Sequence, residues 1–329
     1  IGSGCLYSNT TASHNSALGW NALTANTTGA ANVAVGNYAL TSATTAADNT
    51  AMGYNALGNT TTGASNTAVG GSAMNSNTTG ADNVSIGQSS LYYNLAGGSN
   101  VAVGRDALQS NLNSQNTALG YRAALSNTTG SSNVFIGYRA GYYTNNNITG
   151  DKNIMIGAYS HADSTSTSQS IQIGYDVIGI ANNFSFGYGG TDSRIAFGAT
   201  SISAPSDQRY KKDITTATAG LGFINDLRPV TYKWKNEGDI PSELYAHIAD
   251  STKPYINATL NHGFIAQEVK TAIEAHSEIK DGFGMWSEDG VGGRQRLADG
   301  ALIPMLVKAI QELSTQNEAL AARLTALEA

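Results

Sequence analysis

Ser206 lies in the stretch APSDQRYKKDI, which runs from Ala204 to Ile214 and gathers two acidic and three basic side chains into eleven residues. A serine hydroxyl becomes a nucleophile only when a nearby base removes its proton. A lysine can be that base only in its neutral form, which burial or a nearby positive charge favours by lowering the lysine pKa. The stretch therefore has residue types suited to nucleophilic catalysis. Taken alone, however, the stretch indicates a solvated, charged linker rather than a catalytic site.

The composition of the chain changes near residue 200, next to this stretch. Residues 1–200 contain five Lys or Arg, seven Asp and no Glu. Residues 201–329 contain thirteen basic and seventeen acidic side chains and all five prolines. A globular enzyme domain seldom lacks Glu and Pro over such a length, so we expect a repeat to impose this composition. We predict a repetitive β-fibre shaft at 1–200 and a second domain at 201–329.

Charge and cysteine content exclude several classes of partner and site. The chain of 329 residues has a net charge of −6, whereas a nucleic-acid-binding protein needs a basic face. Its single cysteine, Cys5, excludes a disulfide within the chain and a Cys-rich zinc site. No run of residues approaches the apolar length of a membrane span. We predict no nucleic-acid partner, no membrane insertion, no metal and no cofactor.

Because the chain opens inside a repeat and without Met, we also expect a fragment of a longer protein.

A unit of the form Asn-x-x-x-Gly repeats along the first domain, in segments such as NVAVG and NTALG. Its glycines follow one another mostly 17 residues apart from Gly19 to Gly157, and SIQIG, NFSFG and RIAFG extend the series to Gly198. Four residues such as VAVG fit a short strand with alternating faces, which the glycine ends. A polar turn such as NTTGA then closes the coil. One coil buries too little apolar surface to be stable alone, so the repeat predicts stacked coils, a β-solenoid or β-roll, with the asparagines forming a ladder.

Aromatic residues follow or lie near these glycines, at Tyr38, Tyr54, Tyr121, Tyr138, Tyr142 and Tyr143. They fit a carbohydrate-binding face, and they also fit packing between adjacent coils or chains. We favour packing, which is the commoner role of such residues in a repeat.

The second domain has the pattern of an α+β fold. LGFINDLRPVTYKWK predicts a short helix, then Pro229 and a strand over 230–235. HGFIAQEVKTAIEAHSEI predicts an amphipathic helix whose apolar side chains near one face are Ile265, Val269, Ala272, Ile273 and Ile279.

The chain ends in an apolar series spaced alternately three and four residues apart: Ile303, Leu306, Ile310, Leu313, Asn317, Leu320, Leu324 and Leu327. This spacing is typical of the a and d positions of a coiled coil. A buried Asn at an a position costs stability but fixes register and chain number. The alternative is a single helix docked on its own domain. We favour self-association because the pattern runs to the last turn.

Two parts of the chain resemble known families. The N-x-A-[VI]-G-x-x-A pattern of residues 1–200 resembles the head repeats of trimeric autotransporter adhesins and the β-rich shafts of phage tail fibres. SDQRYKKDI, LRPVTYKWK, GFIAQEV and LIPMLVKAIQEL occur in this order within residues 201–329. Together they resemble the C-terminal intramolecular chaperone domain of phage tailspikes and tail fibres, whose members include the endosialidases.

The second resemblance implies the roles of several residues. The domain drives trimerisation of the upstream fibre and then cuts itself off, with Ser206 as nucleophile, Lys211 as base and the Ser206–Asp207 bond as the cleavage site. Trimer assembly would bury Lys211 and so make the Ser-Lys dyad active only after folding. As supporting residues we expect Arg209, Lys212, Gln267 and Glu268.

Three functions fit the whole chain. We favour the C-terminal part of a homotrimeric phage tail fibre or tailspike, located in the virion tail, assembled in the host cytoplasm and able to contact a host carbohydrate or protein receptor. A bacterial surface adhesin with the same maturation domain is the second. The third, a polysaccharide depolymerase, needs paired carboxylates in a groove. We disfavour it because residues 1–200 hold no Glu and only scattered Asp.

Overall fold

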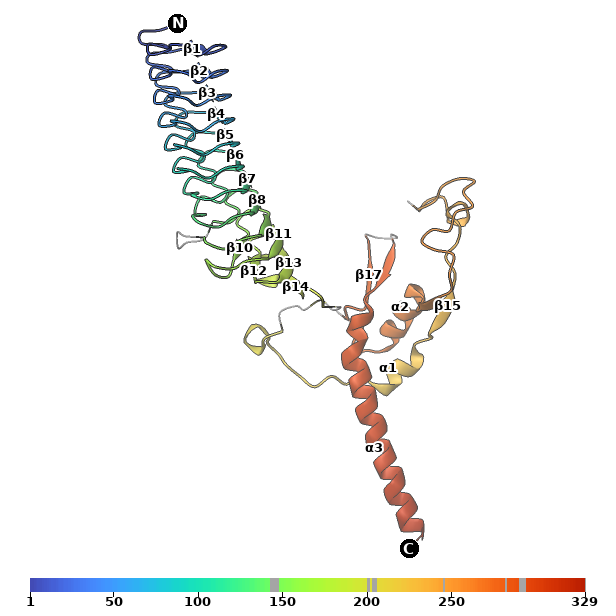
Figure 1. Cartoon of the computed structure of the whole chain (residues 1–329). Coiled ribbons are helices and arrows are strands. Elements are labelled where there is room, and N and C mark those ends of the chain that lie inside the picture. The colour runs from blue at the N-terminus through green and yellow to red at the C-terminus, as the bar shows by residue number, and fades with distance from the viewer. Residues whose placement is uncertain are drawn as a thin grey trace. The chain divides into compact units, whose positions relative to one another are not determined.

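The chain forms two compact units, Ile1–Tyr210 and Lys211–Ala329, which are described separately. The computed structural model describes residues 1–142, 148–199, 202, 206–244, 246–281, 283–289 and 294–328. The first unit is a β-solenoid and the second is an α+β unit that ends in a long helix (Figure 1). The predicted fold class is therefore confirmed.

The solenoid contributes one short strand per coil to a parallel sheet, which is visible in Figure 1 as a stack of aligned strands. These strands are β1 (Ser16–Leu18), β2 (Val33–Val35), β3 (Thr50–Met52), β4 (Thr67–Val69), β5 (Val84–Ile86), β6 (Val101–Val103), β7 (Thr117–Leu119), β8 (Val134–Ile136), β9 (Ile154–Ile156), β11 (Ile171–Tyr175) and β13 (Asn183–Tyr188). A second, two-stranded parallel sheet pairs β10 (His161–Ala162) with β12 (Ile178–Gly179).

The last strand of the sheet differs from the others in direction. The segment RIAFG continues the glycine series in the sequence, but β14 (Ser193–Ala196) pairs antiparallel with β13. A short 3-10 turn at Gly189–Thr191 reverses the chain between these strands. The solenoid therefore ends in a hairpin rather than in a further coil.

The two faces of the parallel sheet differ in side-chain size. The middle residue of each three-residue strand points into the solenoid, where Ala34, Ala51 and Ala68 are wholly buried. The third residues are in register from coil to coil and face outward. We call them the outer row: Leu18, Val35, Met52, Val69, Ile86, Val103, Leu119, Ile136, Ile156, Ile173 and Phe186.

The predicted asparagine ladder runs along the stack at the start of the strands. Asn66 is wholly buried. Its side-chain NH2 group donates to Oδ1 of Asn49 at 3.1 Å and to the carbonyl of Gly80 at 2.9 Å. Its Oδ1 accepts the backbone N–H of Asn83 at 3.1 Å. The backbone N–H bond to the preceding side chain recurs at Asn32, Asn49, Asn83, Asn100, Asn116, Asn133, Asn153 and Ser170.

The repeat glycines allow successive coils to approach closely. Gly70 has φ of +133°, and a Cβ on it would lie 2.7 Å from the carbonyl carbon and oxygen of Gly87 in the next coil. An L side chain is strained at this φ and has no room there. Gly71, the next residue, has no atom within 4 Å of the corresponding Cβ position.

Aromatic rings of adjacent coils pack against one another near the repeat glycines. The ring centroids of Tyr121 and Tyr138 are 5.4 Å apart, and those of Tyr138 and Tyr159 are 5.3 Å apart. Trp20 and Tyr38 form a similar pair at 4.8 Å. The favoured packing between coils is therefore present. Tyr143, which belonged to the same expectation, lies outside the described residues.

The C-terminal unit consists of short elements around a small apolar core. Its helices are α1 (Leu221–Asp226), α2 (Ala266–Ala275) and α3 (Leu302–Glu328). Strand β15 (Val230–Tyr232) pairs antiparallel with β16 (Asn261–Gly263), and β17 (Trp286–Glu288) pairs antiparallel with β18 (Gln295–Leu297). Short 3-10 turns lie at Glu237–Asp239 and Asp299–Ala301, and a further one, Gln208–Tyr210, ends the first unit. The core includes Phe223, Val269, Ile273, Met285 and Leu302.

The predicted amphipathic helix is shorter than its sequence pattern. The segment before it, Asn261–Gly263, is a strand, and the helix ends at Ala275. Val269, Ala272 and Ile273 are buried as expected. Ile265 caps the helix and remains 37 % exposed, whereas Ile279 is buried from the turn beyond it. Backbone pairing with β15 therefore overrides helix propensity at the start of the segment.

Helix α3 docks on its own unit and also exposes its a/d positions. Leu302 and Ala309 are buried, and Glu312 accepts the backbone N–H of Leu221 at 2.8 Å, at the start of α1. The predicted a/d residues lie on another face, where Ile310 is 66 % exposed and Leu324 58 %. Docking of α3 on its own unit and self-association through its a/d residues are thus compatible, because they use different faces of the helix.

We predict that Gly70→Ala destabilises the solenoid and that Gly71→Ala does not. The first change imposes a strained φ and a backbone clash, with an expected cost on the order of 2–4 kcal/mol. The second meets open space, with an expected effect within about 1 kcal/mol. The midpoints of denaturation, followed by far-UV circular dichroism, measure both. Equal midpoints for the two variants would contradict the assignment of close approach to the repeat glycine.

Candidate functional site

The two residues of the expected Ser-Lys pair are five positions apart in the sequence and fall in different units, Ser206 in the first and Lys211 in the second. Both side chains, and that of Lys212, are exposed in the single chain. Burial is one way in which a protein lowers the pKa of a lysine that acts as a base.

Asp207 and Arg209 form a closed turn directly after Ser206. The Asp207 carboxylate accepts the backbone N–H of Arg209 at 2.9 Å and its guanidinium Nε at 3.0 Å. These bonds from Arg209 hold the pKa of Asp207 below its usual value, and the carboxylate raises the pKa of Arg209. The pair is exposed and therefore adds little stability. It fixes the backbone that follows the expected cleavage site and starts the 3-10 turn Gln208–Tyr210.

Gln267 and Glu268 lie on the first turn of α2. The Glu268 carboxylate forms a bidentate pair with Arg228, whose Nε donates to it at 3.0 Å. This pair lowers the pKa of Glu268 and raises that of Arg228. It joins α2 to the LRPV segment before β15. Gln267 is exposed, and its backbone carbonyl accepts the Thr271 hydroxyl at 3.1 Å.

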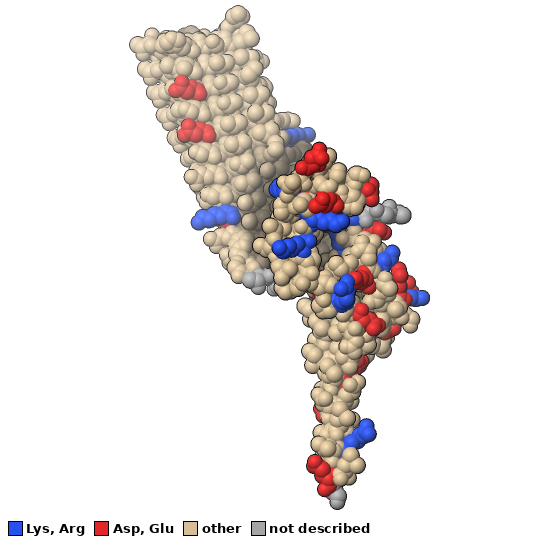
Figure 2. Space-filling view, turned by 90° about the vertical axis from the view of Figure 1, so that its right-hand side faces the viewer, with Lys and Arg blue, Asp and Glu red and all other residues tan. Residues whose placement is uncertain are grey.

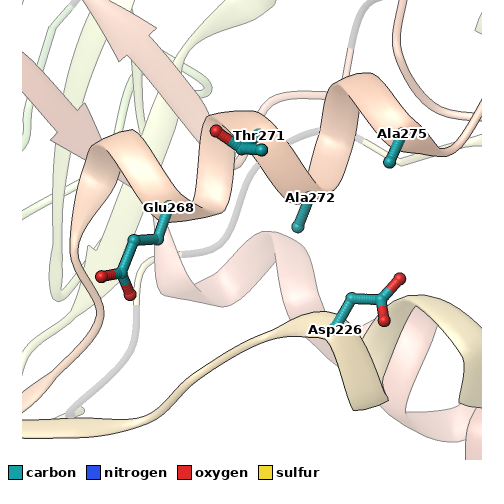
Figure 3. Close-up of a pocket in the computed structure, with 5 residues that line it drawn as sticks. All are labelled: Asp226, Glu268, Thr271, Ala272 and Ala275. Atoms are coloured by element: carbon teal, nitrogen blue, oxygen red, sulfur yellow. The ribbon is translucent and has the colours of Figure 1, made fainter.

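A shallow acidic hollow lies between α2 and the end of α1 (Figure 3). Glu268, Thr271, Ala272 and Ala275 line it from α2, and Asp226 lines it from α1. Its two carboxylates already have partners, since Glu268 pairs with Arg228 and Asp226 with His276. The hollow is therefore built from structural ion pairs rather than from a free pair of carboxylates of the kind that glycoside hydrolysis uses.

His276 connects α1 to the end of α2. Its Nε2 lies 2.8 Å from Oδ2 of Asp226, and its Nδ1 lies 3.2 Å from Oε1 of Glu278. Its ring packs edge-on against the buried Phe223, with the centroids 5.5 Å apart. The bond to Asp226, and secondarily that to Glu278, raises the pKa of His276 although partial burial opposes the rise.

The sequence analysis missed this histidine and its two carboxylates, as well as Arg228. These residues are visible in the sequence, but no sequence motif predicts a contact between Asp226 and His276, which are fifty residues apart. The one available signal was the position of Arg228 and Glu268 inside two of the recognised motifs, LRPVTYKWK and GFIAQEV.

The part of the chain that the structure describes contains neither a cluster of metal-binding side chains nor a membrane-spanning helix. Within it, no group of three or more His, Cys, Asp or Glu side chains has the geometry of a metal site. Within the same residues, no helix has the length and apolar character required to cross a bilayer.

Residues 206–278 match the family described as chaperone of endosialidase, whose name also marks it as a peptidase family. The match begins at Ser206 and covers α1, β15, β16 and α2, but not the β17–β18 hairpin or α3. This part of the chain is therefore a chaperone domain of that family, and the β-solenoid before it fits a fibre-like repeat region. The chain matches no curated protein and no solved structure.

The His276 cluster predicts a pH dependence for the C-terminal unit. A raised pKa means that the folded unit holds this proton more tightly than the unfolded chain does. The resulting stability is fully present below the unfolded pKa of about 6.5 and is lost as pH rises through the folded pKa. We expect the thermal midpoint, followed by the fluorescence of Trp234 and Trp286, to fall as pH is raised above about 6.5.

His276→Gln is the control for this prediction, because glutamine does not titrate. The variant should lose most of the slope above about pH 6.5. If it keeps the wild-type slope, another group controls the pH dependence.

Proposed function

We propose that the chain is the C-terminal part of a homotrimeric phage tail fibre or tailspike. The solenoid is the shaft, and the domain that begins at Ser206 aligns three copies and then leaves by a cut at Ser206–Asp207. One observation carries this proposal: the chaperone family match starts at Ser206, where the charge-poor solenoid gives way to the charged unit. Figure 2 makes this change visible, because charged side chains are sparse on the coils and gather on the C-terminal unit.

The exposed face of α3 supports assembly through this unit. Seven of the eight a/d residues are large and apolar, and they range from 43 % exposed at Leu306 and Leu313 to 84 % at Leu327. An apolar a/d face left in water is unfavourable, and self-association removes it from water. The remaining a position, Asn317, would set register and chain number in the assembled helices.

The Ser206 and Lys211 side chains would perform the cut only once copies have assembled. Lys211 is exposed in the single chain, so burial by neighbouring copies would provide the neutral amine that takes the Ser206 proton. The serine oxygen then bonds to the carbonyl carbon of the Ser206–Asp207 bond, the C–N bond breaks, and the Asp207 amine leaves with the proton that Lys211 took. Water then hydrolyses the resulting ester, which restores the attacking hydroxyl and leaves a free carboxyl group on the cut Ser206. Attack on a serine's own carbonyl would close a four-membered ring. The attacking hydroxyl therefore comes from Ser206 of another copy.

Loss of either dyad side chain should abolish the cut. We expect Ser206→Ala and Lys211→Ala to give intact masses of the full chain, whereas the parent chain gives a fragment that begins at Asp207. Lys233→Ala removes another exposed lysine of the same unit and should cut normally. Native mass spectrometry of the same samples counts the copies. A cut in either dyad variant, or an assembly of two copies, would contradict the proposal.

Mixed assemblies test whether the attack occurs between copies. A Ser206→Ala chain keeps the peptide bond before Asp207 and lacks only its own hydroxyl. When it is co-expressed with parent chains, a fraction of the Ser206→Ala copies should therefore be cut. If these copies stay intact inside mixed assemblies, the attack occurs within one chain by another route.

Release of the C-terminal unit should also change how the fibre resists unfolding. Parallel sheets are slow to nucleate, and a released shaft has lost its template for refolding. Such a shaft is held by a slow unfolding rate. We expect cut parent assemblies to survive heating in detergent longer than the uncut Ser206→Ala assemblies, measured as band intensity against time on a denaturing gel. Equal survival would remove this role for the cut.

A further inference from the structure

The outer face of the solenoid's parallel sheet is apolar along its whole length. Every member of the outer row, from Leu18 to Phe186, has an uncharged apolar side chain. Leu18, Ile86 and Leu119 remain 49 %, 41 % and 48 % exposed in the single chain. The first strand positions on the same face are also uncharged: they include Val33, Val84 and Val134, and they are Ser or Thr at Ser16, Thr50, Thr67 and Thr117.

This face is unusual for a surface in contact with water. Parallel sheets are normally covered on both faces, and here only the inner face is covered by the solenoid core. With strands about 4.8 Å apart, the face is about 50 Å long and about 10 Å wide, or on the order of 500 Å². Contiguous apolar patches of this size generally mark an interaction surface. The position after the repeat glycine is aromatic in some coils, as at Trp20 and Tyr138, and polar or charged in others, as at Asn37, Gln88 and Arg105.

Another face of the same coils has the polar character expected of a free surface. Thr28, Thr45, Thr62 and Thr79 occupy equivalent exposed turn positions in successive coils. The repeat therefore places threonine at the exposed turn positions and an apolar residue at every position of the outer row. Both faces have the same 17-residue periodicity, so periodicity alone does not require an apolar outer row.

We propose that the outer row is the interface between the shafts of copies of this chain. This proposal rests on the proposed homotrimer and assigns its contact face. A partner that covers the whole row needs apolar groups at the same spacing of about 4.8 Å along the same length, which a second copy provides. The row also carries no charge, so copies can approach without desolvating an unpaired ion. The a/d face of α3 is independent evidence of self-association in the same chain.

Cysteine cross-linking in the full-length chain tests the assignment. Cys5→Ser gives a background without thiols that keeps the hydrogen-bond donor to the Gly19 carbonyl. Into it we would place Leu119→Cys on the outer row or, as the matched control, Thr79→Cys on the polar turn face. Both positions are exposed in the single chain. With a short bifunctional maleimide, we expect covalent dimers from the Leu119→Cys chain and monomers from the Thr79→Cys chain.

Native mass spectrometry of the same samples separates failure of this inference from failure of the proposed function. If the copies assemble but do not cross-link at position 119, or cross-link equally at position 79, the outer row is not the interface, whereas the proposed homotrimer is unaffected. Monomers in every sample would overturn both. A monomer whose outer row instead binds glycans or lipid vesicles would also contradict the assignment of this row as an interface between copies.

Discussion

The solenoid depends on a buried hydrogen-bond ladder. Each coil brings an asparagine into an environment without water, where an unsatisfied amide costs about 1–3 kcal/mol. The cost is avoided because the next coil is placed so that its backbone N–H meets the preceding side-chain oxygen, as Asn83 does with Asn66 at 3.1 Å. The ladder therefore fixes the register of each coil on its neighbour. The close approach of the repeat glycines and the alignment of the outer row follow from that register.

The same register aligns the outer row on one face of the sheet. The middle strand positions that point inward are mostly alanine, and larger side chains such as Leu40, Leu57 and Leu108 are wholly buried beside them. The outer row lies outside this core and stays partly exposed in a single chain. The proposed association of copies along this face would bury it. Alignment of long, similar coils is ambiguous, because a slip by one coil still pairs like with like. A separate unit that counts and aligns chains would resolve this ambiguity.

The C-terminal unit has few buried contacts and several ion pairs between its elements. Arg228 joins the start of β15 to α2 through Glu268, and His276 joins α2 to α1 through Asp226. Glu312 of α3 accepts the first free N–H of α1. These contacts are largely exposed and individually weak. They orient α3 on the unit while its a/d face stays exposed.

The sequence by itself determined the repeat, its strands and glycines, the asparagine ladder and the a/d face of α3. It could do so because a fixed period repeats the same local environment many times, and the recognised motifs located the chaperone domain at Ser206. Only the tertiary structure decided which face of the strands is inside, where the middle residues are mostly alanine, since alternation does not say which face is buried. It also decided that the last repeat is antiparallel, that 261–263 forms a strand and that Asp226 meets His276. The last two depend on partner segments distant in the sequence, and no local pattern identifies those partners.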